Sequence, residues 1–129
     1  MIKKLKTITL ACLVIFLFST CTKSTGNPSL VTFEYLSALV NKETEKIVAL
    51  SCNEWETNAI MDVDSLMNIK AELSNVECDE VGREGNEAYV VCSGIIKLTY
   101  DAEIQEIDLN SRKYTLRLEN NDWRMCNYQ

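Results

Sequence analysis

The chain has 129 residues, of which 13 are basic and 19 acidic, and it contains no histidine, so its formal net charge is −6. The acidic balance argues against binding nucleic acid or anionic lipid headgroups through charge. The absence of histidine excludes a Ser-His-Asp triad and any dehydratase that relies on a histidine base.

The first 20 residues have the pattern of an export signal. Lys3, Lys4 and Lys6 precede a mostly apolar run over residues 7–18. Twelve helical residues span roughly 18 Å, whereas a bilayer core of about 30 Å needs around 20 apolar residues. Residues 1–20 are therefore predicted to be a signal peptide that is removed. The remaining 109 residues would keep 10 basic and 19 acidic side chains, a net charge of −9, and are enough for one domain.

Cys21 directly follows the small residues Ser19 and Thr20, and no A-x-A-like cleavage site is present. This arrangement resembles the signal of bacterial lipoproteins, in which the cysteine is acylated, as with palmitate, and begins the mature chain. Phe18 and Thr20 depart from the aliphatic and smaller residues usual at those positions. The resemblance implies lipidation at Cys21, a flexible tether over residues 21–27 and a membrane-anchored location in the bacterial cell envelope. The alternative is an ordinary signal that leaves Cys21 as a spare thiol.

The first part of the remaining chain is predicted to be helical. Asn27 and Pro28 indicate a helix start, with Asn as the N-cap and Pro in the first turn. Thr44 is predicted to cap a second, short helix, and Asp64 or Ser65 a further helical turn that continues to Ile69. Apolar residues recur at helical spacing in the first helix and are expected to face the core: Leu30, Phe33, Leu36, Leu39 and Val40.

From about residue 72 the apolar period changes from helical to two, which predicts strands over 72–81, 87–100, 114–119 and 123–128. Asn120-Asn121-Asp122 is predicted to form a tight turn, because Asn tolerates positive φ. The connection over residues 101–111 is left open: its apolar residues Ile104, Ile107 and Leu109 either extend the hairpin or cover an edge of the sheet. Helices followed by an antiparallel meander predict a single α+β domain over residues 28–129, with a curved sheet of about four strands.

Four cysteines follow the predicted anchor, and an even number in an exported domain indicates disulfides. A zinc site is the competing interpretation, but the sequence has no C-x-x-C pair and no histidine. No metal and no cofactor are predicted. The acidic residues are dispersed along the chain and are interpreted as a solvated surface rather than a calcium site.

The first hairpin links strand register to disulfide pairing. A three-residue loop over 84–86 places Cys78 opposite Cys92, whereas a two-residue loop over 84–85 places it opposite Val91. A slip by one residue sends side chains to the wrong face, so the register and this disulfide depend on each other. The first register is favoured. It leaves Cys52 to pair with Cys126, although the sequence alone permits three connectivities.

Three stretches together resemble small bacterial lipoproteins of the nuclear-transport-factor-2-like superfamily: NPSLVTFEYLSALVNKETEKIVALS, GNEAYVVCSGIIKLTY and YTLRLENNDWRMC. The resemblance implies a curved antiparallel sheet wrapped around helices, a cone with a pocket on its concave side. Members of this superfamily include small-ligand binders, components of larger assemblies, and isomerases and dehydratases. Four residues are candidates for the pocket or core of such a cone, with core packing favoured for the Trp and the Met: Phe33, Tyr114, Trp123 and Met125.

The expected function is that of a non-catalytic binding or interaction module with a small apolar ligand in the cone. The alternative is an assembly or scaffold component that meets another envelope protein through its sheet. An isomerase- or dehydratase-like enzyme is less favoured, because nothing in the sequence places an Asp beside Tyr89, Tyr100 or Tyr114. No catalytic residue is assigned.

Overall fold

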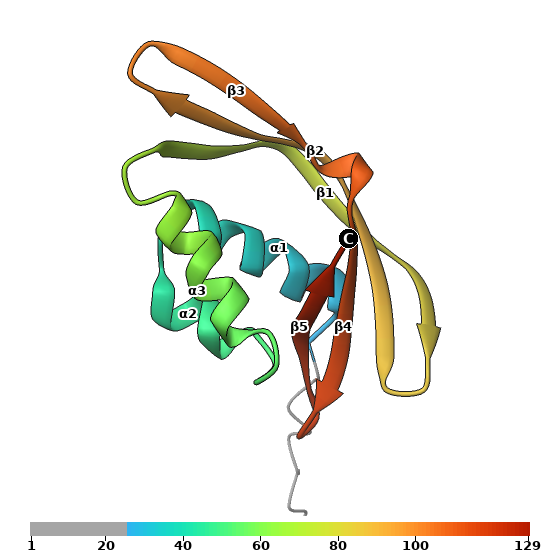
Figure 1. Ribbon diagram of the computed structural model, residues 1–129. Coiled ribbons are helices and arrows are strands. Elements are labelled where there is room, and N and C mark those ends of the chain that lie inside the picture. The colour runs from blue at the N-terminus through green and yellow to red at the C-terminus, as the bar shows by residue number, and fades with distance from the viewer. Residues whose placement is uncertain (1–25) are drawn as a thin grey trace, which may run out of the picture.

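The computed structural model describes residues 26–129, so the predicted signal peptide and the predicted lipidation site at Cys21 lie outside the described residues. Three helices come first, α1 (Pro28–Val40), α2 (Thr44–Ala49) and α3 (Glu56–Ser65). The strands follow (Figure 1): β1 (Lys70–Glu84), β2 (Glu87–Tyr100), β3 (Glu103–Asp108), β4 (Lys113–Glu119) and β5 (Asp122–Tyr128), with a 3-10 turn, Leu109–Ser111, between β3 and β4.

The five strands form one antiparallel sheet in the order β1-β2-β4-β5, and β3 pairs with the second half of β2. The predicted α+β class is confirmed, but the sheet has five strands and not about four. The additional strand is β3, inside the segment that received no assignment. Because β4 pairs only with residues 87–91 of β2, the backbone of residues 95–100 is free for pairing there, and β3 supplies the hydrogen bonds.

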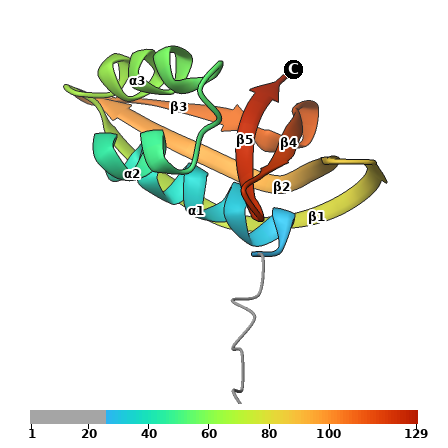
Figure 2. The ribbon, with the colours of Figure 1, turned by 90° about the horizontal axis from the view of Figure 1, so that it is seen from below.

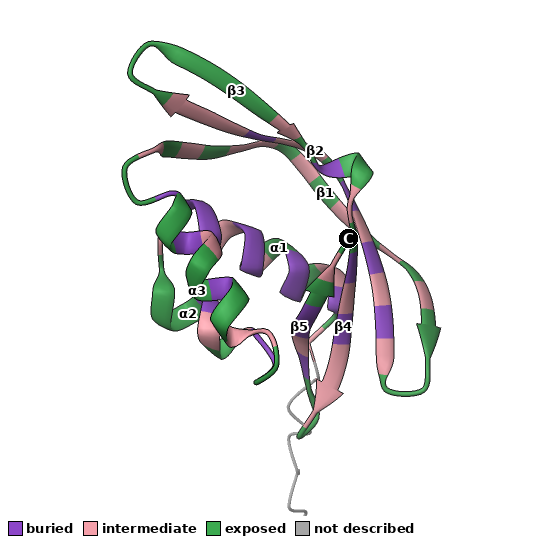
Figure 3. Ribbon diagram, viewed as in Figure 1, coloured by how far each residue is buried: buried purple, intermediate pink, exposed green. Residues whose placement is uncertain are grey.

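The sheet curves around the helices (Figure 1), and α1 lies along β1 (Figure 2). Buried positions gather on one side of α1 and along β2 and β4 (Figure 3). Two irregularities interrupt the β1–β2 ladder, one between Ser74 and Glu77 and one between Glu80 and Gly82. An extra residue in one strand bends that strand and increases its twist, so these bulges help to shape the cone.

Helix α1 begins as predicted, because the Asn27 side chain accepts a hydrogen bond of 2.9 Å from the Ser29 N–H. The face that it buries was predicted in part: Leu36, Leu39 and Val40 are buried, but Leu30 is 53% exposed and Phe33 39% exposed. The buried face extends to Tyr35, which is fully enclosed and was not predicted to face the core. Apolar residues lie on several sides of this helix, so their periodicity did not fix the edges of the buried face. The remaining buried residues of α1 are Pro28, Val31, Thr32 and Ala38.

The other two helix predictions also need correction. Thr44 is the first residue of α2 and not its cap, since the N-cap is Glu43 without a side-chain hydrogen bond. Helix α3 ends at Ser65, near the point where a helical turn was predicted to begin. Only Ala59 and Val63 of α3 are buried, and two small apolar residues in a polar window give a weak helical signal.

The β1–β2 hairpin has the favoured Cys78–Cys92 pairing but not the predicted loop. The turn contains only two residues, Gly85 and Asn86, since Glu84 pairs with Glu87. Residue 81, which has no partner in the ladder, then shifts the register by one, and Cys78 faces Cys92. The register was therefore right because a shorter loop and a bulge compensate each other.

Candidate functional site

Four aromatic side chains meet between the helices and the concave side of the sheet. Tyr35 comes from α1, Trp55 from the residue before α3, Tyr114 from β4 and Tyr128 from β5. The Trp55 indole N–H donates to the Tyr35 hydroxyl at 3.0 Å. The Tyr128 ring lies close to two of the others, with centroid separations of 5.3 Å to the Trp55 ring and 5.7 Å to the Tyr114 ring. Helix α1, the residue before α3 and the last two strands thus supply a polar aromatic cluster inside the cone.

Asp62 of α3 adds a carboxylate to this cluster. The Tyr128 hydroxyl donates to Asp62 Oδ2 at 2.9 Å, and the Arg112 guanidinium lies 4.8 Å from the centre of the Tyr128 ring. Burial raises the pKa of Asp62, and the Tyr128 hydrogen bond and the Arg112 charge oppose that shift. Burial and the neighbouring carboxylate raise the pKa of Tyr128 to about 12. The Tyr128 phenol is therefore protonated at neutral pH and acts as the donor in this hydrogen bond.

A cavity of about 80 Å³ opens beside the Asp62–Tyr128 pair. Its polar lining comes from Asp62, Ser65, Arg112 and Tyr128. The rest of the lining is aliphatic and is contributed by α1, the end of α3, and strands β2 and β3: Leu39, Leu66, Ile96, Leu98 and Ile107. An apolar wall with a few convergent polar groups is the usual composition of a small-molecule site.

The hydroxyl of Tyr114 is fully buried and has no hydrogen-bond partner among residues 26–129. Burial is also the largest cause of its raised pKa. A buried hydroxyl without a partner costs roughly 1–3 kcal/mol of lost solvation. Tyr114 does not itself line the cavity, although its ring lies next to that of Tyr128, which does.

The residues proposed for a pocket from the sequence do not meet at one site. Tyr114 belongs to the aromatic cluster, whereas Phe33 is exposed and does not line the cavity. Met125 is fully buried in the core, and Trp123 is nearly so. The Trp123 ring lies under the Arg83 guanidinium, 4.8 Å away, in a shallow depression at the start of α1.

Several functional candidates were missed by sequence reasoning. Asp62 lies in the helix that the sequence did not predict, and Arg112 lies directly after the segment without an assignment. Tyr128 was placed on the last strand, but no local pattern shows that it contacts a residue 66 positions earlier. The signal for this site is a long-range contact, and composition or spacing cannot supply it.

Two disulfides are present, Cys78–Cys92 across the first hairpin and Cys52–Cys126 between the α2–α3 connection and β5. These are the two pairings that the sequence favoured. The Cα atoms are 4.0 Å apart in the first bridge and 5.3 Å apart in the second. Within residues 26–129, no helix is both long and apolar enough to cross a membrane.

No protein-family model matches the chain, and no curated protein is similar to it in sequence. Solved structures do resemble it. A SEC-C motif containing protein from Rhodopseudomonas palustris is 12% identical with a TM-score of 0.56, over 84% of this chain and 81% of that one. A nuclear transport factor 2-like protein with a cystatin-like fold, from Novosphingobium aromaticivorans, is 13% identical with a TM-score of 0.54, over 75% and 73%.

A ketosteroid isomerase-like protein from Erwinia carotovora atroseptica is 12% identical, with a TM-score of 0.56 over 83% of this chain and 94% of that one. These identities are too low to transfer an activity, and they show the fold alone. The predicted likeness to the nuclear-transport-factor-2-like superfamily is therefore confirmed as a similarity of fold. The chain has the helix-filled, curved-sheet cone of that fold.

Proposed function

We propose that this protein is a lipid-anchored component of the bacterial cell envelope whose cone binds a small ligand without catalysing a reaction. The observation that supports ligand binding is the cavity between α3 and the sheet, with the Asp62–Tyr128 pair at its wall. It combines aliphatic side chains with one carboxylate and one guanidinium, so it can hold an apolar body and orient a polar end.

The size of the cavity limits the ligand. About 80 Å³ is far below the roughly 300–1,000 Å³ of sites that enclose a drug-sized molecule. The ligand is therefore a molecule of few heavy atoms, or a longer one that inserts only its end. Its polar group donates to Asp62 or accepts from Arg112, which are the charged groups that line this space.

Native mass spectrometry of the protein extracted gently from its own envelope tests this proposal. We expect one additional small mass that is lost on denaturation. Tyr128→Phe frees the Asp62 carboxylate from its internal donor and should change the fraction of protein that carries this mass. Tyr89→Phe is the matched control, because that hydroxyl donates to Glu84 or Glu87 and Tyr89 does not line the cavity.

A bare protein in every preparation would contradict the ligand proposal. A protein partner in place of the small mass would favour the assembly role instead. Equal ligand occupancy in the wild type and Tyr128→Phe would show that the ligand binds elsewhere.

A second candidate function is proton transfer on a small carbonyl compound. It is favoured by the half-buried Asp62 with its raised pKa, next to a Tyr donor, and by the shared fold with a ketosteroid isomerase-like protein. In this role Asp62 would be the base, and Tyr128, which lines the same cavity, would donate to the developing oxyanion. Incorporation of solvent deuterium into the bound ligand, lost in Asp62→Asn, would establish it. If the bound ligand takes up no deuterium, the result would contradict proton transfer and would be consistent with ligand binding alone.

The anchor is tested separately in growing cells. Cys21→Ala should release the protein from the membrane fraction, because several buried acyl chains are needed for durable attachment. Cys12→Ala is the matched control, since Cys12 lies within the apolar run of the predicted signal. Membrane retention of the Cys21→Ala protein would refute lipid anchoring at this residue without affecting the ligand proposal.

A further inference from the structure

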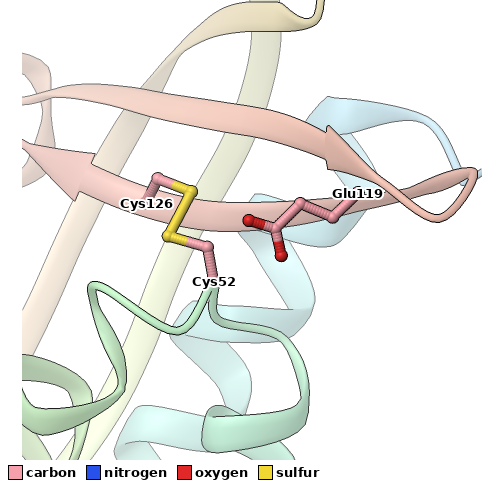
Figure 4. A group of neighbouring side chains, drawn as sticks. All are labelled: Cys52, Glu119 and Cys126. Atoms are coloured by element: carbon pink, nitrogen blue, oxygen red, sulfur yellow. A yellow bond between two sulfur atoms is a disulfide. The ribbon is translucent and has the colours of Figure 1, made fainter.

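The Cys52–Cys126 disulfide has a carboxylate beside it. The two sulfur atoms and a carboxylate oxygen of Glu119 all lie within 4.8 Å of one another. Figure 4 shows the Glu119 side chain extending from its strand with its carboxylate turned toward the bridge. Among residues 26–129, Glu119 forms no ion pair that would hold this carboxylate elsewhere.

The backbone holds the two cysteines together independently of the sulfur–sulfur bond. The Cys52 N–H donates to the Met125 carbonyl at 2.8 Å, and the Met125 N–H donates to the Leu50 carbonyl at 2.7 Å. Arg124 also donates to the Ala49 carbonyl. These contacts fasten the segment before α3 along β5 like an additional short strand, so the cysteines should stay adjacent when the bridge is opened.

Cys126 faces Cys52 because of a bulge in β5. Leu116 pairs with Met125, whereas Thr115 pairs with Asn127, which leaves Cys126 as the extra residue. Met125 and Cys126 are consequently both buried although they are neighbours in a strand. A bulge of this kind redirects one side chain without breaking the ladder.

We propose that reduction converts this bridge into a binding site for a zinc-class divalent cation, with two thiolates and the Glu119 carboxylate as ligands. Borderline-soft cations of this class favour thiolate ligands, and zinc also accepts carboxylate oxygen. With Zn–S bonds of about 2.3 Å, tetrahedral coordination requires the sulfurs to move only to about 3.8 Å apart. The Cα separation of 5.3 Å allows this through side-chain rotation. Water completes the coordination sphere on the side where Glu119 is partly exposed.

The reductant is a dithiol, and the electrons balance as in ordinary thiol–disulfide exchange. Its thiolate attacks the sulfur of Cys126, which is 8% exposed, and Cys52, which is fully buried, departs as a thiolate. The second thiol of the reductant then closes its own disulfide and releases Cys126. The protein gains two electrons and two protons, and the dithiol loses them. Cation binding subsequently displaces both thiol protons.

The Cys78–Cys92 bridge has, among the residues that the structure describes, no third metal-ligating side chain beside it comparable to Glu119. Within the described part of the chain, Cys52, Glu119 and Cys126 form the only group of three metal-ligating side chains with mutually close donor atoms. Cys78 and Cys92 therefore serve as an internal comparison, since they are also a disulfide pair but have no third ligand at that distance.

Cadmium is the probe, because its thiolate complexes absorb in the ultraviolet. The mature Cys78→Ser/Cys92→Ser protein, reduced with a dithiol under anaerobic conditions and freed of it, should bind one Cd²⁺ per chain and develop a thiolate–cadmium band. The oxidised protein should not. Competition with a chelator should show that Glu119→Gln weakens binding about tenfold or more. Glu54→Gln, which removes a nearby carboxylate outside the donor group, should leave the affinity unchanged.

The converse variant, Cys52→Ser/Cys126→Ser, retains Cys78, Cys92 and Cys21. Its reduced thiols also bind Cd²⁺, but Cys78 and Cys92 have no third ligand at a comparable distance among the described residues, so it should bind about tenfold or more weakly than the reduced Cys78→Ser/Cys92→Ser protein. Equal or tighter binding by the converse variant, or no band in the reduced Cys78→Ser/Cys92→Ser protein, would overturn the proposal. So would equal affinities of Glu119→Gln and Glu54→Gln. Loss of the near-ultraviolet circular dichroism on reduction would also overturn it, because the site requires the backbone to hold both cysteines in place.

Discussion

Gly94 lies so close to the backbone of Asn75 that a Cβ atom on Gly94 would stand 2.5 Å from the Asn75 carbonyl oxygen. Both residues have positive φ, +93° for Gly94 and +51° for Asn75. They face each other where the β1–β2 register shifts between Ser74 and Glu77, so this contact is the inner side of a bulge. The bend in the two longest strands of the cone depends on the absence of a side chain here.

Gly94→Ala should therefore destabilise the protein more than other glycine substitutions. Gly85→Ala is the matched control, because Gly85 also has positive φ but a Cβ atom there would meet no other atom within 4 Å. We expect a loss of about 1–2 kcal/mol for Gly85→Ala from backbone strain alone, and about 3 kcal/mol or more for Gly94→Ala. Urea unfolding measures both, and equal losses would show that the Asn75 carbonyl moves away freely.

The two disulfides should contribute unequally to stability. The Cys52–Cys126 bridge joins residues 74 positions apart, and the Cys78–Cys92 bridge joins residues 14 apart. The loop-entropy relation predicts that the longer bridge contributes about 1.5 kcal/mol more to the free energy of unfolding. Comparison of the two double Cys→Ser variants by urea unfolding checks this difference. A larger loss for the hairpin pair would mean that native-state packing outweighs chain entropy.

Two tyrosines should respond in opposite ways to the same substitution. Tyr35→Phe removes the acceptor of the Trp55 indole N–H and should cost about 1 kcal/mol. Tyr114→Phe removes a buried hydroxyl that has no partner among the described residues, and should be neutral or stabilising. Thermal or urea unfolding of both variants and the wild type measures these two changes in the free energy of unfolding. A clear loss for Tyr114→Phe would indicate that water or a ligand binds its hydroxyl.

Asp62 should make stability fall as the pH rises. Because burial raises its pKa above the ordinary 3.8, the folded protein holds this proton more tightly than the unfolded chain does. The stability that this tighter proton binding adds to the folded protein is fully present below the pKa of the unfolded chain. It is lost as the pH rises through the pKa of Asp62 in the folded protein. Asp62→Asn keeps a carbonyl oxygen for Tyr128 but does not titrate, so its stability relative to the wild type should increase as the pH rises from about 4 toward neutrality, until Asp62 of the folded wild type has ionised.

Urea unfolding of Asp62→Asn and the wild type across that pH range gives the required difference. Asp108→Asn is a useful contrast, because hydrogen bonds from Asn110 lower the pKa of Asp108. The stability that the ionised Asp108 contributes is fully present above the ordinary pKa of 3.8 and is lost as the pH falls, so the difference between that variant and the wild type should stay constant from about pH 4 to 7 and change only below about pH 4. A pH-independent difference for Asp62→Asn would show that its carboxylate is well solvated in the folded protein.

The strands were predicted more accurately than the helices. Strand β2 has the predicted bounds of 87–100, since its Val, Ile and Tyr residues and the turns on both sides mark it clearly. In the β4–β5 turn, Asn120 and Asn121 both have positive φ, as Asn permits. Helix α3 was missed because only Ala59 and Val63 are buried in it, which gives too weak a local apolar stripe.

By itself, the sequence determined the features that depend on neighbouring residues: the Asn27 cap, the change from helices to strands near residue 70, and the alternation in β4. The tertiary structure decided which face of α1 is buried, and it brought Asp62 to Tyr128 and Glu119 to the Cys52–Cys126 bridge. The physical reason is the range of the interactions. Capping, turn conformation and strand alternation act over a few residues, whereas a site is assembled by packing between segments that the chain leaves far apart.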